Sequence, residues 1–161
     1  MSGMAGLPTR PSLKPSRSPS SWSNTNRSGD SMLVLDENVP AGQRLLLRKW
    51  RVHFRVIGVD VASWGTTDEN LIPALHGLPR PTFFTLDQNF YPRVWVHRGY
   101  CRVWLDVADD RAAEFVRRFL RHPPFETRAR RTGIVARVHS RGVQFWKSAR
   151  RGSQTVEWPH P

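Results

Sequence analysis

Apolar and polar residues alternate in two different patterns between residues 32 and 147. Residues 32–35 are continuously apolar and predict a short buried strand, and Pro40 opens a predicted helix that ends near Trp50. Residues 52–59 alternate between apolar and polar side chains, which indicates a second strand. The order of strand, loop and helix in residues 32–50 is the first half of a βαβ unit.

The same alternation continues along the middle of the chain. Residues 66–76 predict a second helix that carries acids in its first turn, where negative charge is favoured. Residues 82–86 predict a buried strand, and residues 87–90 predict a short helix or turn. Residues 102–107 predict a fourth strand. The chain therefore keeps alternating between strands and helices.

The clearest helical periodicity spans residues 111–122, and Asp109 and Asp110 are expected to cap this helix. Residues 134–139 and 143–146 then predict a closing β-hairpin. Strands that alternate with helices predict an α/β domain with a mainly parallel sheet, right-handed crossovers and both faces covered.

The two ends of the chain differ from this domain, which we place at residues 32–147. Residues 1–31 are rich in Ser, Pro, Gly, Arg and Asn and are expected to be disordered. Their composition also allows a basic transit peptide, although four prolines would break its helix. A simpler hypothesis is that translation starts at Met32 and that the upstream segment is an over-extended gene start. Residues 148–161 are expected to be a polar tail.

The chain is strongly basic, with 25 Lys and Arg against 13 Asp and Glu and a net charge of +12. A surface rich in arginine gives salt-sensitive affinity for phosphate, so nucleic acid is the first partner to consider. An acidic partner protein or an arginine-rich genome are the alternatives.

The apolar runs are far too short to cross a bilayer, so no membrane association is expected. The only cysteine, Cys101, lies in an apolar stretch and is expected to act as a small buried hydrophobe. A single cysteine cannot form an internal disulfide, which fits a reducing, cytoplasmic setting.

Acidic residues follow the predicted strands at equivalent positions. Asp36 ends the first strand and Asp87 ends the third, so a parallel sheet places both at one edge. Asp68 and Glu69 open the helix after the second strand and are expected to emerge there too. Each acid taken alone is also explained as a helix cap, but their recurrence favours a shared cleft that binds Mg²⁺ or Mn²⁺. Asp106, at the end of the fourth strand, is a candidate outer ligand.

Three sequence blocks carry a resemblance to a known family. Residues 35–40 read LDENVP, residues 67–72 read TDENLI and residues 85–90 read TLDQNF. In this order they resemble the toxin subgroup of the PIN-like family, whose members carry LLDENLP, SDEEIL and TRDKDF blocks. The likeness covers residues 32–107.

The resemblance implies a three-layer α/β/α PIN-like fold and a Mg²⁺- or Mn²⁺-dependent ribonuclease, commonly the toxin of a toxin–antitoxin pair. By position, Asp36, Asp87 and either Asp68 or Glu69 would bind the metal and activate water for attack on RNA. Asn89 stands where the family usually has a second Asp and, with Glu37, is a candidate for orienting water or a ligand. A cognate antitoxin protein and a homodimer are the expected partners.

A second group of basic residues surrounds the predicted hairpin, close to Phe145 and Trp146. Its arginines could grip an RNA backbone while the aromatic rings stack on bases. The alternative is a solvated face over core aromatics. The residues are Arg128, Arg130, Arg131, Arg137 and Arg141.

Two other functions use similar residues. A catalytically weak PIN-like module would bind nucleic acid or a partner protein without cutting, and Asn89 favours this alternative. A phospho-acceptor receiver domain also has Asp at strand ends, but it needs an acidic pair in the first loop and a late Lys. The only late lysine, Lys147, falls in the predicted hairpin.

Overall fold

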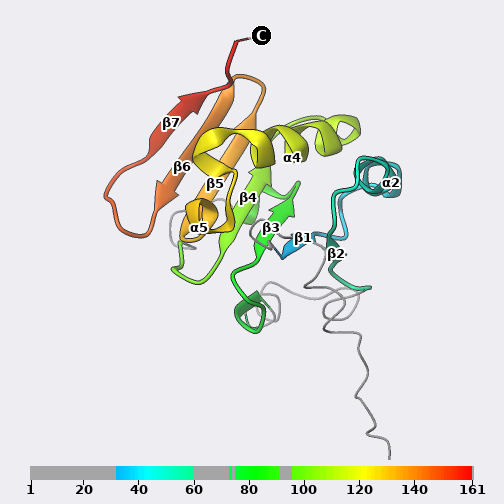
Figure 1. Ribbon diagram of the computed structural model, residues 1–161, viewed down its shortest axis with the longest axis horizontal. Coiled ribbons are helices and arrows are strands. Elements are labelled where there is room, and N and C mark those ends of the chain that lie inside the picture. The colour runs from blue at the N-terminus through cyan, green and yellow to red at the C-terminus, as the bar shows by residue number, and fades with distance from the viewer. Residues whose placement is uncertain (1–31, 60–72, 74, 91–95, 161) are drawn as a thin grey trace, which may run out of the picture. The chain divides into compact units, whose positions relative to one another are not determined.

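A seven-stranded mixed sheet organises the part of the chain that the computed structural model describes, residues 32–59, 73, 75–90 and 96–160 (Figure 1). The strand order is β2-β1-β3-β4-β5-β6-β7. The strands from β2 to β5 run parallel, and β5, β6 and β7 are antiparallel. The prediction of a mainly parallel α/β sheet with a closing hairpin is confirmed. The strands are β1 Leu33–Leu35, β2 Arg55–Val56, β3 Thr82–Thr85, β4 Cys101–Leu105, β5 Ile134–His139, β6 Gly142–Lys147 and β7 Gln154–Glu157.

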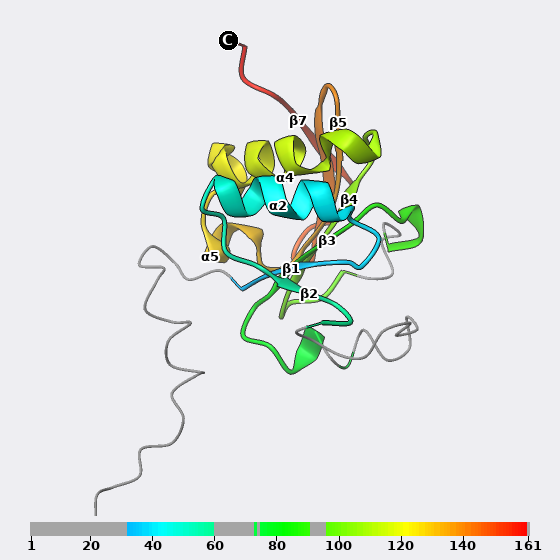
Figure 2. The same cartoon turned by 90° about the vertical axis from the view of Figure 1, so that its right-hand side faces the viewer.

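Helices α2 and α4 pack side by side against one face of this sheet (Figure 2). Leu47 of α2 and Phe119 of α4 share a buried cluster with Leu35 and Phe84. The described helices and 3-10 turns are α2 Ala41–Lys49, α4 Ala112–Arg121, α5 Arg128–Arg131, η1 Gln88–Phe90, η3 Asp109–Arg111 and η4 Pro123–Phe125.

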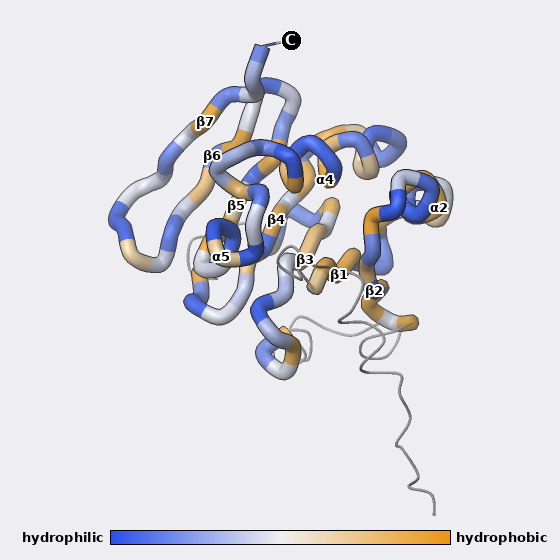
Figure 3. Tube along the Cα trace, in the orientation of Figure 1, coloured by the Kyte–Doolittle hydropathy of each residue, from blue (hydrophilic) through white to orange (hydrophobic). Residues whose placement is uncertain are grey.

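The opposite face of the sheet holds a smaller buried cluster that includes Val34 and Phe83. Successive strand residues point to opposite faces, so the continuous apolar run of β1 supplies both clusters. Figure 3 shows this hydrophobic run clearly. The predictions for residues 1–31 and for most of the helix at 66–76 lie outside the described residues. No helix in the described part is both long and apolar enough to cross a membrane.

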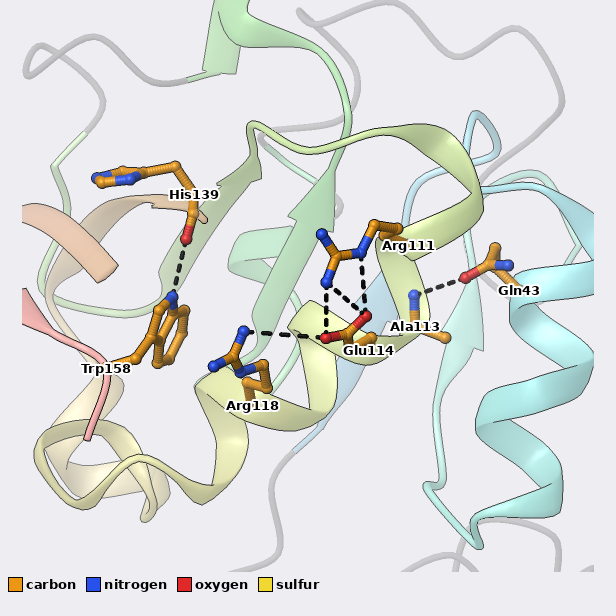
Figure 4. Close-up of polar contacts among 7 residues, drawn as sticks. All are labelled: Gln43, Arg111, Ala113, Glu114, Arg118, His139 and Trp158. Carbon is orange, nitrogen blue, oxygen red and sulfur yellow. Dashed lines mark hydrogen bonds and ion pairs between the residues drawn. The ribbon is translucent and has the colours of Figure 1, made fainter. Parts of the chain in front are cut away.

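The structure corrects the prediction of a polar tail after residue 147. Strand β7 pairs with β6, and Trp158 after it is buried. The indole Nε1 of Trp158 donates to the His139 carbonyl at 2.8 Å (Figure 4). The Trp158 ring also packs against Phe115 and His122. Only Val156 gives β7 an apolar signal, so the pattern of polar residues hid this edge strand.

The predicted helix caps at Asp109 and Asp110 are also corrected. Both residues are exposed in η3, and neither the 3-10 turn nor α4 has a side-chain cap hydrogen bond. Instead, the side chain of Gln43 in α2 accepts from the backbone N–H of Ala113 at 2.9 Å (Figure 4). A side chain distant in sequence therefore satisfies a helix N–H that the local sequence was expected to satisfy.

Strand β2, helix α5 and Cys101 also bear on the sequence predictions. The predicted second strand is reduced to Arg55–Val56, although the N–H of Ile57 still donates to the Leu35 carbonyl at 2.9 Å. Helix α5 was not predicted. Cys101 is fully buried, and burial raises the pKa of its thiol to about 12, which confirms its expected role as a small hydrophobe.

Candidate active site

Strands β1 and β3 place the first two candidate acids at one edge of the sheet. The two strands are parallel neighbours in which Leu35 lies opposite Phe84. The backbone N–H of Asp36 donates to the Phe84 carbonyl at 2.9 Å, which fixes Asp36 beside the end of β3. The carboxyl ends of parallel strands are where α/β sheets place their ligand sites.

Thr85 connects the two acids through its buried hydroxyl group. The hydroxyl donates to Oδ2 of Asp36 at 2.7 Å and accepts from the backbone N–H of Asp87 at 3.0 Å. It also accepts from Nδ2 of Asn38 at 3.3 Å, and Oδ1 of Asn38 accepts from the Leu86 N–H at 3.2 Å. One donor and two acceptor positions are all that a hydroxyl offers, so Thr85 is fully used. These bonds hold Asp36, Asn38 and Asp87 as one unit.

Asp87 receives a further hydrogen bond from the turn that follows it. Its Oδ1 accepts from the backbone N–H of Asn89 at 3.0 Å, while the Asn89 side chain is exposed. Asn89 therefore orients Asp87 through its main chain, which any residue except proline can do.

The carboxyl group of Asp36 sits in a crowded environment. Burial raises its pKa above the ordinary value of 3.8, and the carboxylates of Glu37 and Asp87 raise it further. Hydrogen bonds from the Thr85 hydroxyl and the Glu37 backbone oppose this rise. Half-buried negative charges at this edge therefore destabilise one another, and a cation between them would relieve the repulsion.

Asp106 also lies at the carboxyl edge, but its charge is already compensated. It follows β4, and its backbone N–H donates to the Val138 carbonyl at 2.8 Å. Both Nε and Nη2 of Arg137 donate to Oδ2 of Asp106, at 2.8 and 2.6 Å. The same guanidinium group lies 5.3 Å from the centre of the Trp104 ring. The candidate outer ligand and one candidate RNA-binding arginine thus form an ion pair with each other.

The other arginines near the hairpin do not form one free surface. Arg131 is 1% exposed, and its guanidinium donates to Oγ1 of Thr82 at 3.0 Å and to the Phe125 carbonyl at 2.8 Å. This burial corrects the prediction that Arg131 contacts RNA. Arg130 is exposed and donates to the Pro123 carbonyl at 2.6 Å, Arg128 is half-buried in α5, and Arg141 is exposed.

Two of the expected metal-binding acids therefore come together, whereas Asp68 and Glu69 lie outside the described residues. Within the described ranges, no group of three or more His, Cys, Asp or Glu residues is close enough to hold a metal ion. The hard oxygen atoms of Asp36 and Asp87 nevertheless suit Mg²⁺ or Mn²⁺. Burial is the main cause of the raised pKa of Asp36, and the charges of Glu37 and Asp87 add to it, so a bound cation would favour the ionised carboxylate.

Asn38 and Thr85 are the site residues that the sequence did not single out. Both lie inside the sequence blocks that carry the acids, but only the register between β1 and β3 shows that they meet. No protein-family model, curated protein or solved structure matches this chain. The assignment of a function consequently rests on the residues and their geometry.

Proposed function

We propose that this chain is a PIN-like ribonuclease that hydrolyses RNA phosphodiester bonds with the help of Mg²⁺ or Mn²⁺. The observation that carries the proposal is the junction at which Thr85 holds Asp36 and Asp87 together at the carboxyl edge. The net charge of +12 supports a polyanionic substrate. A three-layer α/β/α PIN-like fold, a cytoplasmic location, a homodimer and an antitoxin partner belong to the same proposal.

The chain's own residues have distinct tasks in this reaction. Asp36 and Asp87 would hold the cation, which when bound polarises the scissile phosphate and lowers the pKa of a water molecule. Thr85 positions both acids, and the main chain of Asn89 orients Asp87. Asp68 or Glu69 would orient the attacking water, and Glu37 adds negative charge beside Asp36.

A second candidate function is nucleic-acid or partner binding without cleavage. It is favoured by Asn89, which brings no charge where the resembling family has an acid. Its amide side chain is exposed, and no hydrogen bond of that side chain is found within the described ranges. The two functions differ in whether RNA is cut.

An RNA cleavage assay with the full chain separates them. Structured RNAs are incubated with Mn²⁺ or with EDTA, using the parent protein and the Asp36→Asn and Asp87→Asn variants. We expect EDTA to abolish cleavage and each variant to lower its rate on the order of 100-fold, as for the loss of a metal-site partner. Asp109→Asn and Asp110→Asn are matched controls, because both acids are exposed in η3.

Cleavage that survives EDTA, or that is unchanged in both Asp36→Asn and Asp87→Asn, would overturn the metal–carboxylate mechanism. RNA binding by the parent protein without any cleavage would instead support the non-cutting alternative.

A further inference from the structure

The surface of α2 and α4 carries a large share of the chain's positive charge. Residues 41–51 and 111–121 contain eight Arg and Lys but only one acid, Glu114. Figure 3 shows hydrophilic stretches along both helices. The basic residues are Arg44, Arg48, Lys49, Arg51, Arg111, Arg117, Arg118 and Arg121.

The two helices run in the same direction, away from the edge that holds Asp36. Near their first turns, the Gln43 side chain bonds to the Ala113 N–H at 2.9 Å. Near the end of α2, the Arg117 guanidinium lies 4.6 Å from the centre of the Trp50 ring. The views in Figures 1 and 2 agree that the helices lie side by side. The first turns of both helices therefore lie toward the candidate site, and most of their basic side chains lie in the last turns, farther from it.

Six of these cations form no ion pair within the described part of the chain. Glu114 pairs with Arg111 at 2.9 Å and approaches Arg118 at 3.9 Å, so its charge is already engaged. Of these six, Arg44 has a buried Nε and Arg51 follows the end of α2. The other four, which we call the helical cations, are Arg48, Lys49, Arg117 and Arg121. Favourable interaction with helix dipoles explains basic residues in a last turn, but it does not compensate their mutual repulsion.

Aromatic rings support two of the helical cations at the surface. Arg48 lies 5.0 Å above the ring of Phe54, and Arg117 stacks on Trp50. A guanidinium that stacks on a ring keeps its N–H edges available for bidentate bonds to phosphate. Lys49 and Arg121, which are exposed, add two further charges.

We propose that the helical cations bind the phosphate backbone of an RNA strand that extends from them along the two helices to the carboxyl edge of the sheet. A polynucleotide supplies the regularly spaced negative charge that this surface lacks. The identity of the polyanion and the direction of the path rest on the proposed ribonuclease function.

The test measures RNA binding by the full chain in EDTA, where metal-dependent cleavage does not occur. A fluorescently labelled short single-stranded RNA is titrated at several salt concentrations, and anisotropy gives the affinity. The variant is Lys49→Gln with Arg121→Gln, because neither side chain has a described hydrogen bond, ion pair or ring contact. The control is Arg150→Gln with Arg151→Gln, which removes the same charge from two exposed residues between β6 and β7.

We expect the Lys49/Arg121 variant to reduce the slope of log affinity against log salt by about 1.4, because each lost phosphate contact on a single strand removes about 0.7. The control should change the slope far less. Equal changes in the two variants would overturn the proposal, because net charge alone would then explain binding. The proposal would also be overturned, in favour of a protein partner, if Lys49 and Arg121 were needed to bind an acidic polypeptide but not to bind RNA.

The RNA-binding experiment and the cleavage assay can contradict their two proposals independently of each other. If the parent protein cleaves RNA while the Lys49/Arg121 variant binds RNA as tightly as the parent, only the helical path is wrong. If RNA binding depends on these cations but no RNA is cut, the helical path stands and the ribonuclease function fails.

Discussion

At the scale of single residues, the Thr85 hydroxyl connects the two candidate acids. It donates to Asp36 and accepts from the N–H of Asp87, so a Thr85→Val substitution removes both bonds while nearly preserving shape. We expect the pKa of Asp36 to rise further in this variant, because the lost donor stabilised the ionised carboxylate. We also expect RNA cleavage to fall about 10- to 100-fold, as for outer partners of metal ligands.

Titration of the Asp36 carboxyl carbon by NMR measures the first effect. Thr155→Val is the matched control, because Thr155 is exposed on β7. If the pKa of Asp36 were unchanged in the Thr85 variant, the Thr85 hydroxyl would not stabilise the ionised Asp36 carboxylate.

The charge of Asp36 also predicts how stability depends on pH. Its pKa is higher in the folded protein than the ordinary value of 3.8, so between these two values the folded state binds more protons than the unfolded state. The contribution of the Asp36 carboxyl group to the free energy of unfolding is fully present below pH 3.8. It is lost as the pH rises through the pKa that this group has in the folded protein. An asparagine cannot ionise and therefore avoids this loss.

We thus expect the free energy of unfolding of Asp36→Asn, relative to the parent protein, to increase as the pH rises from acid to neutral. Urea unfolding across this pH range measures the difference, and Asp109→Asn controls for the loss of one negative charge. A difference that is constant with pH, or that decreases, would contradict the described environment of Asp36.

Single residues were predicted unevenly from the sequence. Asp36 and Asp87 could be identified because each follows an apolar run, and the structure places both at the predicted edge. Asn38 and Thr85 could not, because the hydrogen bonds that join the first block to the third connect residues 47 or more positions apart. Arg131 was misjudged because a four-residue helix is too short for periodicity to show which arginine is buried.

At the scale of elements, β7 depends on a single aromatic anchor. Trp158 packs on Phe115 and donates to the His139 carbonyl, and this fastens the last strand to α4 and β5. We expect Trp158→Ala to lower the free energy of unfolding by about 3–5 kcal/mol, the usual loss for a large buried side chain. Trp158→Phe should lose about 1 kcal/mol, mainly through the missing hydrogen bond.

Urea unfolding of these two variants, beside Thr155→Ala on the exposed side of β7, measures both values. If Trp158→Ala unfolded like the parent protein, residues 148–161 would be the polar tail that the sequence indicated.

Elements with a strong apolar pattern were predicted well, and polar ones were not. Strand β3 and helix α4 lie within one or two residues of their predicted bounds, because their side chains fill the core. Strand β7 alternates half-buried and exposed residues with one apolar side chain, so only its pairing with β6 defines it. The N-terminus of α4 was misread because Gln43, from another helix, bonds to it.

At the scale of the whole molecule, the buried core extends from Leu33 to Trp158. A protein that begins at Met32 should therefore have the same free energy of unfolding as the full chain, because every described core residue is retained. Thermal and urea unfolding of the two proteins compare them directly. A lower stability on removal of residues 1–31 would show that this segment contributes to the fold.

The packing of the sheet and helices places the candidate acids at the carboxyl edge and the helical cations on the surface of α2 and α4. The sequence predicted parallel strands, and parallel strands alone place acids at one edge. It could not predict the strand order, which sets Asp106 beside Arg137 and so neutralises one acid of that edge. It also could not show that the cations of α2 and α4 share one surface, because this follows from helix packing.

Cation binding at the carboxyl edge is the decisive measurement for a metal-dependent site, because it does not require knowledge of the RNA target. Mn²⁺ is titrated into the full chain, and paramagnetic broadening of each backbone amide signal is followed by NMR. We expect the signals of Asp36, Asp87 and their neighbours to broaden first, and Asp36→Asn to weaken this effect about 10- to 100-fold. Broadening that begins elsewhere, or that is unchanged in Asp36→Asn, would contradict a metal-dependent site at this edge.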